Sequence, residues 1–293
     1  MKLKYNIIAL LLASLLTACT TDMELNLKGA APELVVEGTI TTDTLAHNVS
    51  LKKTADYFSN NAAEVISGAT VTLSDGLTTI TLAEVELKKG NYQTPANYFG
   101  VVGRTYTLTI DNVDVNGDGL IERYTASCPI ATKVPVDSID VKKARLFQSD
   151  MWAIKAWVQD PEDETNHYLV RNYKNDKLVS DSIPEWGVTD DEFYNGKYLK
   201  DETIMYFSST KEDEKLVKGD KVTLEWCSIT KDYQAYIQEV QEEFRGRNPL
   251  FGGQPANIRT NIKQLLPVDG KNSAHGYFAA YSVSWAETVY DGE

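Results

Sequence analysis

Apolar and polar side chains alternate along several short segments in the first half of the chain. In ELVVEGTIT, the even-numbered residues from Leu34 to Ile40 are Leu, Val, Gly and Ile, and the other face is mainly polar. In RTYTLTIDN, Tyr106, Leu108 and Ile110 alternate with threonines. A repeat of two places such side chains on one face of a β-strand. The pattern therefore predicts strands with one buried face.

Turn-forming residues separate these segments. Asp75-Gly76 lies between ATVTLS and LTTITLAE, and a second turn signal, Gly90-Asn91, follows ELKK. About seven short strands within roughly a hundred residues are typical of a two-sheet sandwich. We therefore predict an all-β fold that begins with an immunoglobulin-like or transthyretin-like β-sandwich over residues 33–133.

The second half of the chain is also rich in strand patterns, although they are less regular. VPVDSI at residues 134–139 reads as the linker into this region. Strand patterns then recur in WAIKAWVQD, HYLVRNY, ETIMYFSS, DKVTLEWCSI and GYFAAYSVSW. Asn195-Gly196 and Lys218-Gly219-Asp220 are interpreted as hairpin turns. Residues 134–293 are therefore predicted to form a second β-rich domain.

One segment of this second region has the period of an α-helix. Residues 231–245 carry apolar side chains at steps of three and four, namely Tyr233, Tyr236, Ile237, Val240 and Phe244. Thr230 is a suitable N-cap, Asp232 suits the first turn, and Gly246 can end the helix. We expect this apolar face to pack into the core of the second domain.

The N-terminus has the pattern of an export signal. Lys2 and Lys4 precede a short apolar run that ends at Leu16, and Thr17-Ala18 lead into Cys19. The run is shorter than the roughly 20 residues that a membrane-spanning helix needs. The sequence Leu-Thr-Ala-Cys resembles the bacterial lipobox, which implies cleavage after residue 18 and lipidation of Cys19. The alternative is an ordinary signal peptide with an incidental cysteine.

Residues 19–32 are predicted to form a polar tether behind this anchor. Two or three acyl chains on Cys19 would hold the protein on a membrane, whereas one chain gives only reversible binding. Asp22 and Glu24 follow closely. They resemble the signal that directs lipoproteins of the Bacteroidota to the outer face of the outer membrane, although a plain solvated tether would have the same composition.

The overall charge limits the classes of partner. The 293 residues carry a formal net charge of −13, and removing Lys2 and Lys4 with the signal gives −15. A strongly acidic protein is repelled by nucleic acid and by anionic lipid. The balance suits an exported, soluble body, and the 42% of hydrophobic residues is enough for a sizeable core.

The remaining cysteines and the histidines give no clear site. Cys128 and Cys227 could form a disulfide in an oxidising compartment or could be two buried free thiols. The three histidines lie far apart along the chain and share no metal-ligand spacing. Both readings of the cysteines stay open at this point.

DVNGDGLIE is the segment that most resembles a metal site. Asp114, Asn116, Asp118 and Glu122 supply oxygen atoms at spacings found in calcium loops. The twelfth position, however, is Thr125, where such loops have a bidentate acid. Strand patterns also flank the segment on both sides. We therefore predict a hairpin loop that binds calcium weakly at most, and no other cofactor.

No motif for nucleophilic catalysis or phosphate binding is present in the sequence. Among the tryptophans, Trp152, Trp157, Trp226 and Trp285 lie in strand patterns and are interpreted as core residues. Trp186 lies in a polar segment and is the best candidate for exposure. A tryptophan can stack on a planar ligand, but packing is its more usual role.

A long irregular segment follows the predicted helix. The stretch from Asn248 to Ile262 is rich in glycine, proline and asparagine, and loops of this length are often functional. Arginine and apolar side chains together are common anchors of protein interfaces. The candidate contact residues are Arg247, Leu250, Phe251 and Arg259. The alternative is that Leu250 and Phe251 fold back onto a sheet.

Several of these segments also occur together in a known family. LVVEGTITTD, ISGATVTLSDG, GNYQT, RTYTLTI, VPVDSI, RNPLFGG and AHGYFAAYSVS follow one another in this order. With the lipobox, they resemble the Bacteroidota lipoproteins called the domain of unknown function 4249 family. The resemblance implies an outer-membrane accessory lipoprotein, often encoded beside a TonB-dependent transporter, with no known catalytic residues.

The function expected from the sequence is therefore that of a non-catalytic, surface-exposed outer-membrane lipoprotein. It would bind a ligand or partner for a TonB-dependent nutrient uptake system. The alternative is a structural or adhesive lipoprotein of the fimbrial type, and an exported hydrolase is a third hypothesis.

Overall fold

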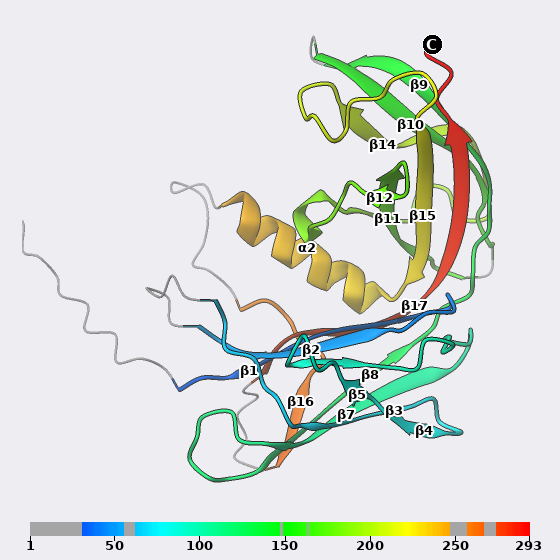
Figure 1. Cartoon of the computed structure of the whole chain (residues 1–293). Coiled ribbons are helices and arrows are strands. Elements are labelled where there is room, and N and C mark those ends of the chain that lie inside the picture. Colours follow the sequence, from blue (N-terminus) through cyan, green and yellow to red (C-terminus); the bar gives the residue numbers. More distant parts are fainter. Residues whose placement is uncertain (1–30, 56–61, 147–148, 163, 247–256, 267–273) are drawn as a thin grey trace, which may run out of the picture. The chain divides into compact units, whose positions relative to one another are not determined.

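The computed structural model (Figure 1) describes most of the chain after the tether. The described residues are 31–55, 62–146, 149–162, 164–246, 257–266 and 274–293. Residues Pro32–Glu293 form one compact unit. The signal peptide and Cys19 lie outside the described residues, so their predicted roles stay predictions.

The fold is dominated by β-strands in three sheets. The largest has nine strands in the order β12 (Lys177–Leu178), β11 (His167–Lys174), β15 (Lys221–Ile229), β17 (Ala274–Val289), β1 (Leu34–Thr41), β2 (Asn48–Lys53), β6 (Asn91–Gln93) and β5 (Ala83–Glu84), with β13 (Gly187–Asp190) also paired to β11. A five-stranded sheet has the order β16 (Lys263–Leu266), β8 (Glu122–Pro129), β7 (Thr105–Val113), β3 (Thr70–Ser74) and β4 (Thr79–Thr81). A three-stranded sheet has the order β14 (Tyr198–Ser208), β10 (Ser149–Gln159) and β9 (Val136–Leu146).

The predicted all-β fold is confirmed, and the alternating segments have the predicted orientation. Leu34, Val36 and Ile40 are fully buried in β1, as is Leu108 in β7. They belong to a sandwich-like core between the β1–β2–β6 part of the nine-stranded sheet and the five-stranded sheet. Burying one face of each sheet in this way is what an alternating pattern requires.

A second core lies farther along the chain. It joins β9, β10 and β14 to the face of β11 and β15 that carries Tyr168 and Trp226. Ile154 and Val158 of β10 are buried in it, as the alternation in WAIKAWVQD predicts. The predicted boundary near residue 134 falls between β8 and β9, but the first core also contains Ile262 and Phe278 from beyond it.

Strand β17 connects the two parts of the protein. From Ala274 to Tyr281 it pairs in parallel with β1, and from Ser282 to Val289 it pairs antiparallel with β15. Its Phe278 belongs to the first core, whereas Ala286 packs against the second. The two predicted domains therefore have separate cores but share one sheet.

The predicted helix is present as α2 (Lys231–Arg245), the only α-helix among the described residues. The Thr230 hydroxyl accepts a hydrogen bond from the backbone N–H of Tyr233, and Gly246 ends the helix with a φ of 74°. This cap and this stop are the ones expected from the sequence. A short 3-10 turn, η1 (Ile183–Glu185), lies beside the helix.

The predicted buried face of α2 is only partly correct. Tyr233, Tyr236 and Ile237 are buried and Val240 is partly buried, but Phe244 is 75% exposed. The helical period continues to Phe244, but this residue lies in the last turn. Figure 1 shows that this end of α2 lies away from β15 and β17. The apolar face of α2 thus extends one turn beyond the part of the sheet against which the helix packs.

Three other sequence interpretations are corrected. Asp75-Gly76 does form the β3–β4 hairpin, but Asn195-Gly196 joins β13 to β14 in different sheets and is not a hairpin. Lys218-Gly219-Asp220 likewise lies between β14 and β15, which do not pair. Trp285 is 44% exposed and is not a core residue, because its indole N–H points to the Asp43 carboxylate.

Candidate functional site

One face of the nine-stranded sheet lies toward α2, and its side chains follow from the strand register. Glu37 of β1 is paired with Tyr277 of β17 and with Ser50 of β2, so these three side chains lie side by side on this face. Toward β15 the face is aromatic and packs against the helix. Toward β2 and β6 it is polar.

A cleft lies where the helix meets the polar part of this face. Its volume is about 560 Å³, within the range of small-molecule sites. We call it the helix–sheet cleft. It is lined by Glu37, Gly38, Thr39, Asn48, Ser50, Lys52, Asn91, Ile183, Trp186, Tyr233, Tyr236 and Tyr277. Figure 1 shows α2 crossing above β1 and β2.

Tyrosine side chains form the helix side of the cleft. The ring centroid of Tyr277 lies 5.0 Å from that of Tyr233 and 4.9 Å from that of Tyr236, distances typical of attractive ring pairs. Burial raises the pKa of Tyr236 to about 12, and the negative charge of Glu37 adds to this rise. All three tyrosines therefore stay protonated at neutral pH and can donate hydrogen bonds.

Polar side chains form the sheet side. The Lys52 ammonium lies 2.9 Å from the Glu37 carboxylate, so the two charges in the cleft compensate each other. The Asn48 amide donates to the Asn91 side-chain oxygen at 3.1 Å. The cleft therefore combines aromatic rings with amides, hydroxyls and one neutralised ion pair.

Trp186 closes the cleft beside η1. Its indole N–H donates to the Ser180 carbonyl at 3.2 Å, and the Arg171 guanidinium lies 5.3 Å from its ring centroid. The Gln241 amide of α2 donates to the Trp186 carbonyl at 2.9 Å. Trp186 is half-buried rather than freely exposed, but it is the tryptophan that reaches the cleft.

A buried ion pair lies in the aromatic part of the same sheet face. The Arg171 guanidinium lies 2.5 Å from the Glu225 carboxylate, which also accepts a hydrogen bond from the Tyr173 hydroxyl. Burial alone would lower the pKa of Arg171, but Tyr281 and Glu225 outweigh it and the pKa rises. The Arg171 guanidinium therefore stays charged, and it packs against the ring of Trp186.

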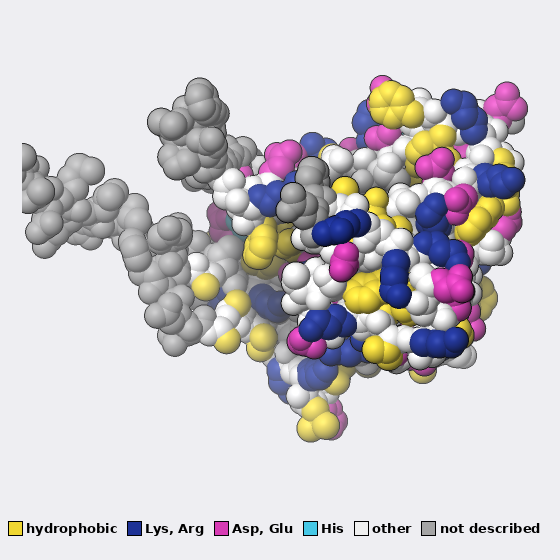
Figure 2. Space-filling view, turned by 90° about the horizontal axis from the view of Figure 1, so that it is seen from above, with side chains coloured by type: hydrophobic (Ala, Val, Ile, Leu, Met, Phe, Trp, Pro, Cys, Tyr) yellow, Lys and Arg dark blue, Asp and Glu magenta, His cyan; other side chains and the backbone are white. Residues whose placement is uncertain are grey.

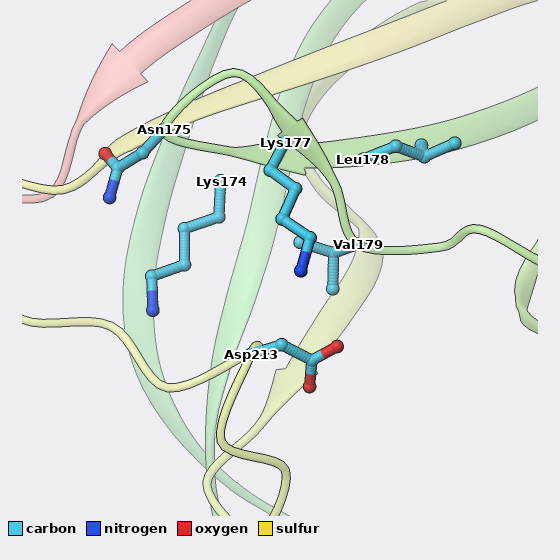
Figure 3. A pocket seen from close by; sticks show the side chains of 6 residues that line it. All are labelled: Lys174, Asn175, Lys177, Leu178, Val179 and Asp213. Carbon is cyan, nitrogen blue, oxygen red and sulfur yellow. The ribbon is translucent and has the colours of Figure 1, made fainter.

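A second hollow, of about 340 Å³, lies at the β11–β12 hairpin. Figure 3 shows the amines of Lys174 and Lys177 on the same side as the Asp213 carboxylate. The Lys174 ammonium is already held by Asp220 at 3.7 Å and by the Lys215 carbonyl. The larger helix–sheet cleft is therefore the better candidate site.

The predicted hairpin loop between β7 and β8 is confirmed. The Asp114 carboxylate accepts from the backbone N–H groups of Gly117 and Gly119, Asp118 accepts from Leu120, and Glu122 accepts from Val115. These oxygens thus stabilise turns. Within the described residues, no three His, Cys, Asp or Glu side chains are grouped to hold a metal ion.

Cys128 and Cys227 are both buried free thiols, so the disulfide reading is wrong. The Cys128 thiol donates to the Ala280 carbonyl in the first core. Cys227 lies under α2, where burial raises its thiol pKa well above the usual value. The two thiols thus belong to different clusters, Cys128 to the first core and Cys227 to the cluster under α2.

The predicted contact loop is only partly described. Arg247, Leu250 and Phe251 lie outside the described residues. Arg259 is tied to the helix, because its guanidinium and its backbone N–H both bind the Glu239 carboxylate, at 2.8 and 2.7 Å. This end of the loop is therefore anchored beside α2.

Most residues of the cleft are not identified by the sequence pattern. Glu37 and Thr39 belong to the mainly polar face of a predicted strand, and Tyr233 and Tyr236 to the apolar face of the predicted helix. The sequence does show a strand with a polar face, β1, and a helix rich in tyrosine, α2. Only the pairing of β1 with β17 brings the two together at the cleft. That juxtaposition depends on pairing between residues far apart in the chain.

Charges on the surface are mixed rather than segregated. Figure 2 shows basic side chains interspersed with acidic ones on the face it presents. Such a mixture is typical of a solvated surface. The face shown therefore has no patch of one charge that would mark a binding site, and the cleft remains the candidate site.

Comparison with known proteins gives a family and no named relative. The profile of the family described as Domain of unknown function (DUF4249) matches residues 20–286. No curated protein matches the chain.

Proposed function

The chain belongs to the DUF4249 family, and from this premise we propose that it is a non-catalytic, surface-exposed outer-membrane lipoprotein. It serves as an accessory binding component of a TonB-dependent nutrient uptake system. The observation that carries the proposal is the helix–sheet cleft, where three tyrosines and Trp186 face amides, hydroxyls and a neutralised ion pair. This is a set of groups for recognition.

The anchor supports the proposed location. The N-terminal charge, the apolar run and the Leu-Thr-Ala-Cys sequence are in register for lipidation of Cys19. Tethering beside a transporter raises the effective concentration of a bound nutrient without requiring high intrinsic affinity.

Among the residues that the structure describes, no helix is long and apolar enough to cross a bilayer.

The chemistry of the cleft supports binding rather than catalysis. Its carboxylate, Glu37, is paired with Lys52, and its tyrosines have raised pKa values and remain neutral. A general base or nucleophile needs a group that can accept or release a proton near neutral pH. Cys128 and Cys227 are buried and do not line the cleft, and the pKa of Cys227 is strongly raised.

We also keep the segment from Asn248 to Ile262 as the proposed contact with the transporter. Arg247, Leu250, Phe251 and Arg259 are its candidate contact residues. The link between Arg259 and Glu239 places the end of this segment beside α2 and hence near one wall of the cleft. A partner bound there would be close to the captured ligand.

Affinity purification from intact cells tests this proposal. A C-terminal tag on the full-length protein should recover a TonB-dependent transporter after mild cross-linking, and Cys19→Ala should release the protein from the membrane and reduce the recovery. Recovery of fimbrial subunits instead would favour the adhesive alternative. If no transporter is recovered, the proposed uptake role is wrong. Deletion of residues 249–255 with unchanged recovery would reject only the contact segment.

A further inference from the structure

The helix–sheet cleft contains hydroxyl groups that open into it and have no protein partner within the described residues. Ser50 and Tyr236 are only 8% and 9% exposed, and both line the cleft. Within the described part of the chain, neither hydroxyl has a hydrogen-bond partner. Neither hydroxyl oxygen is among the enclosed polar atoms without partners, so both are accessible from the cleft. Little reorganisation is needed for a bound ligand to use them, because no protein bond has to be broken.

The neighbouring polar atoms have the same character. Among the described residues, the Thr39 hydroxyl and the Asn48 side-chain oxygen also have no protein partner, although the Asn48 amide donates to Asn91. Hydroxyls can donate or accept, and an amide oxygen accepts. A matching ligand must therefore present several groups that both donate and accept within a short distance.

The charged residues of the cleft favour a neutral ligand over a strongly ionic one. Glu37 and Lys52 form a pair at 2.9 Å, so an anion would compete with Glu37 and a cation with Lys52. Removing a charged ligand from water without a compensating partner is costly. A neutral polar ligand avoids this cost and can still bond to both members of the pair.

The strand order disfavours an extended peptide. A peptide that adds to a sheet needs a strand with an unpaired edge. The strands that line the cleft are central ones, because β1 lies between β17 and β2, and β2 lies between β1 and β6. Their backbone groups are used within the sheet. A peptide helix would instead need apolar anchor sites, whereas this part of the sheet face is polar.

We propose that the cleft binds a neutral oligosaccharide. This inference rests on the proposed function as a binding component and specifies its ligand class. Sugar hydroxyls would bond to Ser50, Thr39, Asn48 and Tyr236, and the apolar face of a sugar ring would contact the aromatic side chains of the cleft wall. The volume of about 560 Å³ is that of a small-molecule site and would hold a short segment of a longer glycan.

A double substitution tests the assignment with a matched control. Ser50→Ala with Tyr236→Phe removes the two unpartnered hydroxyls of the cleft and keeps the packing. Ser282→Ala with Tyr290→Phe removes the hydroxyls of two other buried residues, which have no partners within the described part of the chain and do not line the cleft. Both variants delete the same groups from buried positions, so a nonspecific effect on folding should affect both.

Affinity electrophoresis of the full mature protein would use gels containing starch, dextran, xylan, mannan, laminarin or levan. At least one of these neutral glycans should retard the wild type and the Ser282/Tyr290 variant equally. The Ser50/Tyr236 variant should bind about 30-fold more weakly, as expected for two lost neutral hydrogen bonds. Calorimetry with the matching trisaccharide gives the fold-change.

Three results would overturn the inference. One is the absence of retardation by every neutral glycan. Another is tighter binding to polygalacturonate, or to a casein peptide mixture, than to any neutral glycan. The third is equal binding by the two double variants. Each of these leaves the uptake role open, because recovery of a transporter with the wild-type protein is measured separately.

Discussion

The sheet face toward α2 has two halves with the same geometry and different chemistry. In the aromatic half, over β11, β15 and β17, the Arg171–Glu225 pair is largely buried, with side-chain exposures of 17% and 3%. In the polar half, over β1, β2 and β6, the Lys52–Glu37 pair is exposed by 38% and 58%. One pair fixes the packing under the helix, and the other remains accessible to a ligand.

This difference follows from what covers each half. The helix places Tyr233 and Ile237 over the aromatic half, where Cys227 and Tyr281 complete a third apolar cluster. Toward the polar half it presents Tyr236, whose hydroxyl has no protein partner within the described residues. The same helix thus covers the aromatic half, which becomes an apolar core, and forms one wall of the cleft over the polar half.

Breaking each ion pair should show the largest contrast. Arg171→Met leaves the buried Glu225 carboxylate without its positively charged partner and should lower the free energy of unfolding by about 3–5 kcal/mol. Lys52→Met removes an accessible pair and should change it by about 0–1 kcal/mol. Urea denaturation measures both. Similar losses would contradict the distinction between the halves.

The connection between the halves should be nearly as sensitive. Gly276 lies where β17 joins β1, with a φ of +82°, and an added Cβ would lie 2.0 Å from the Val36 carbonyl oxygen. Left-handed backbone costs other residues about 1–2 kcal/mol, so the added clash should bring the loss for Gly276→Ala to roughly 3 kcal/mol or more.

Gly117→Ala provides the control for this prediction. Gly117 has a similar φ of +77°, but nothing lies within 4 Å of an added Cβ. Its substitution should cost only the backbone strain, about 1 kcal/mol. Equal melting temperatures for the two alanine variants would show that the close approach of β1 and β17 is absent in solution.

The helix surface offers a third test. Val240 packs against the third cluster, whereas Phe244 is mostly exposed. Val240→Asp should lower the free energy of unfolding by about 2 kcal/mol because a charge enters a partly buried site. Phe244→Asp should change it by less than about 0.5 kcal/mol. The reverse order in chemical denaturation would mean that Phe244, not Val240, faces the core.

The smallest expected effect is on the alkaline side of the stability curve. The pKa of Tyr236 is raised from 10.0 to about 12, mainly by burial. Between these values the unfolded state has lost the phenol proton that the folded state retains, so stability falls as the pH rises. Tyr236→Phe should remove about 1–2 kcal/mol of this decline. Parallel stability curves for wild type and variant would show that Tyr236 titrates normally.

Local patterns predicted much of the fold but not the arrangement of its parts. Alternation at Leu34 to Ile40, and the Thr230 and Gly246 signals of α2, act within a few residues and are confirmed. The parallel pairing of β1 with β17 joins residues such as Leu34 and Ala274, which no local pattern relates. The cleft depends on that pairing and therefore could not be predicted.

The misread side chains have a common physical cause. A repeat identifies the apolar face of an element, but it does not say how far the neighbouring surface extends or what lies over the polar face. Phe244 continues a helical stripe beyond its partner surface. Glu37 lies on a polar strand face that borders a cleft rather than open solvent.

A crystal structure of the mature protein soaked with the best-binding trisaccharide would test the central claim most directly. The claim is that the helix–sheet cleft is the ligand site. The account predicts sugar density between the β1–β2 face and α2, with sugar hydroxyls within hydrogen-bond distance of Ser50 and Tyr236. Density at the β11–β12 hollow beside Lys174 and Lys177, with an empty cleft, would contradict it.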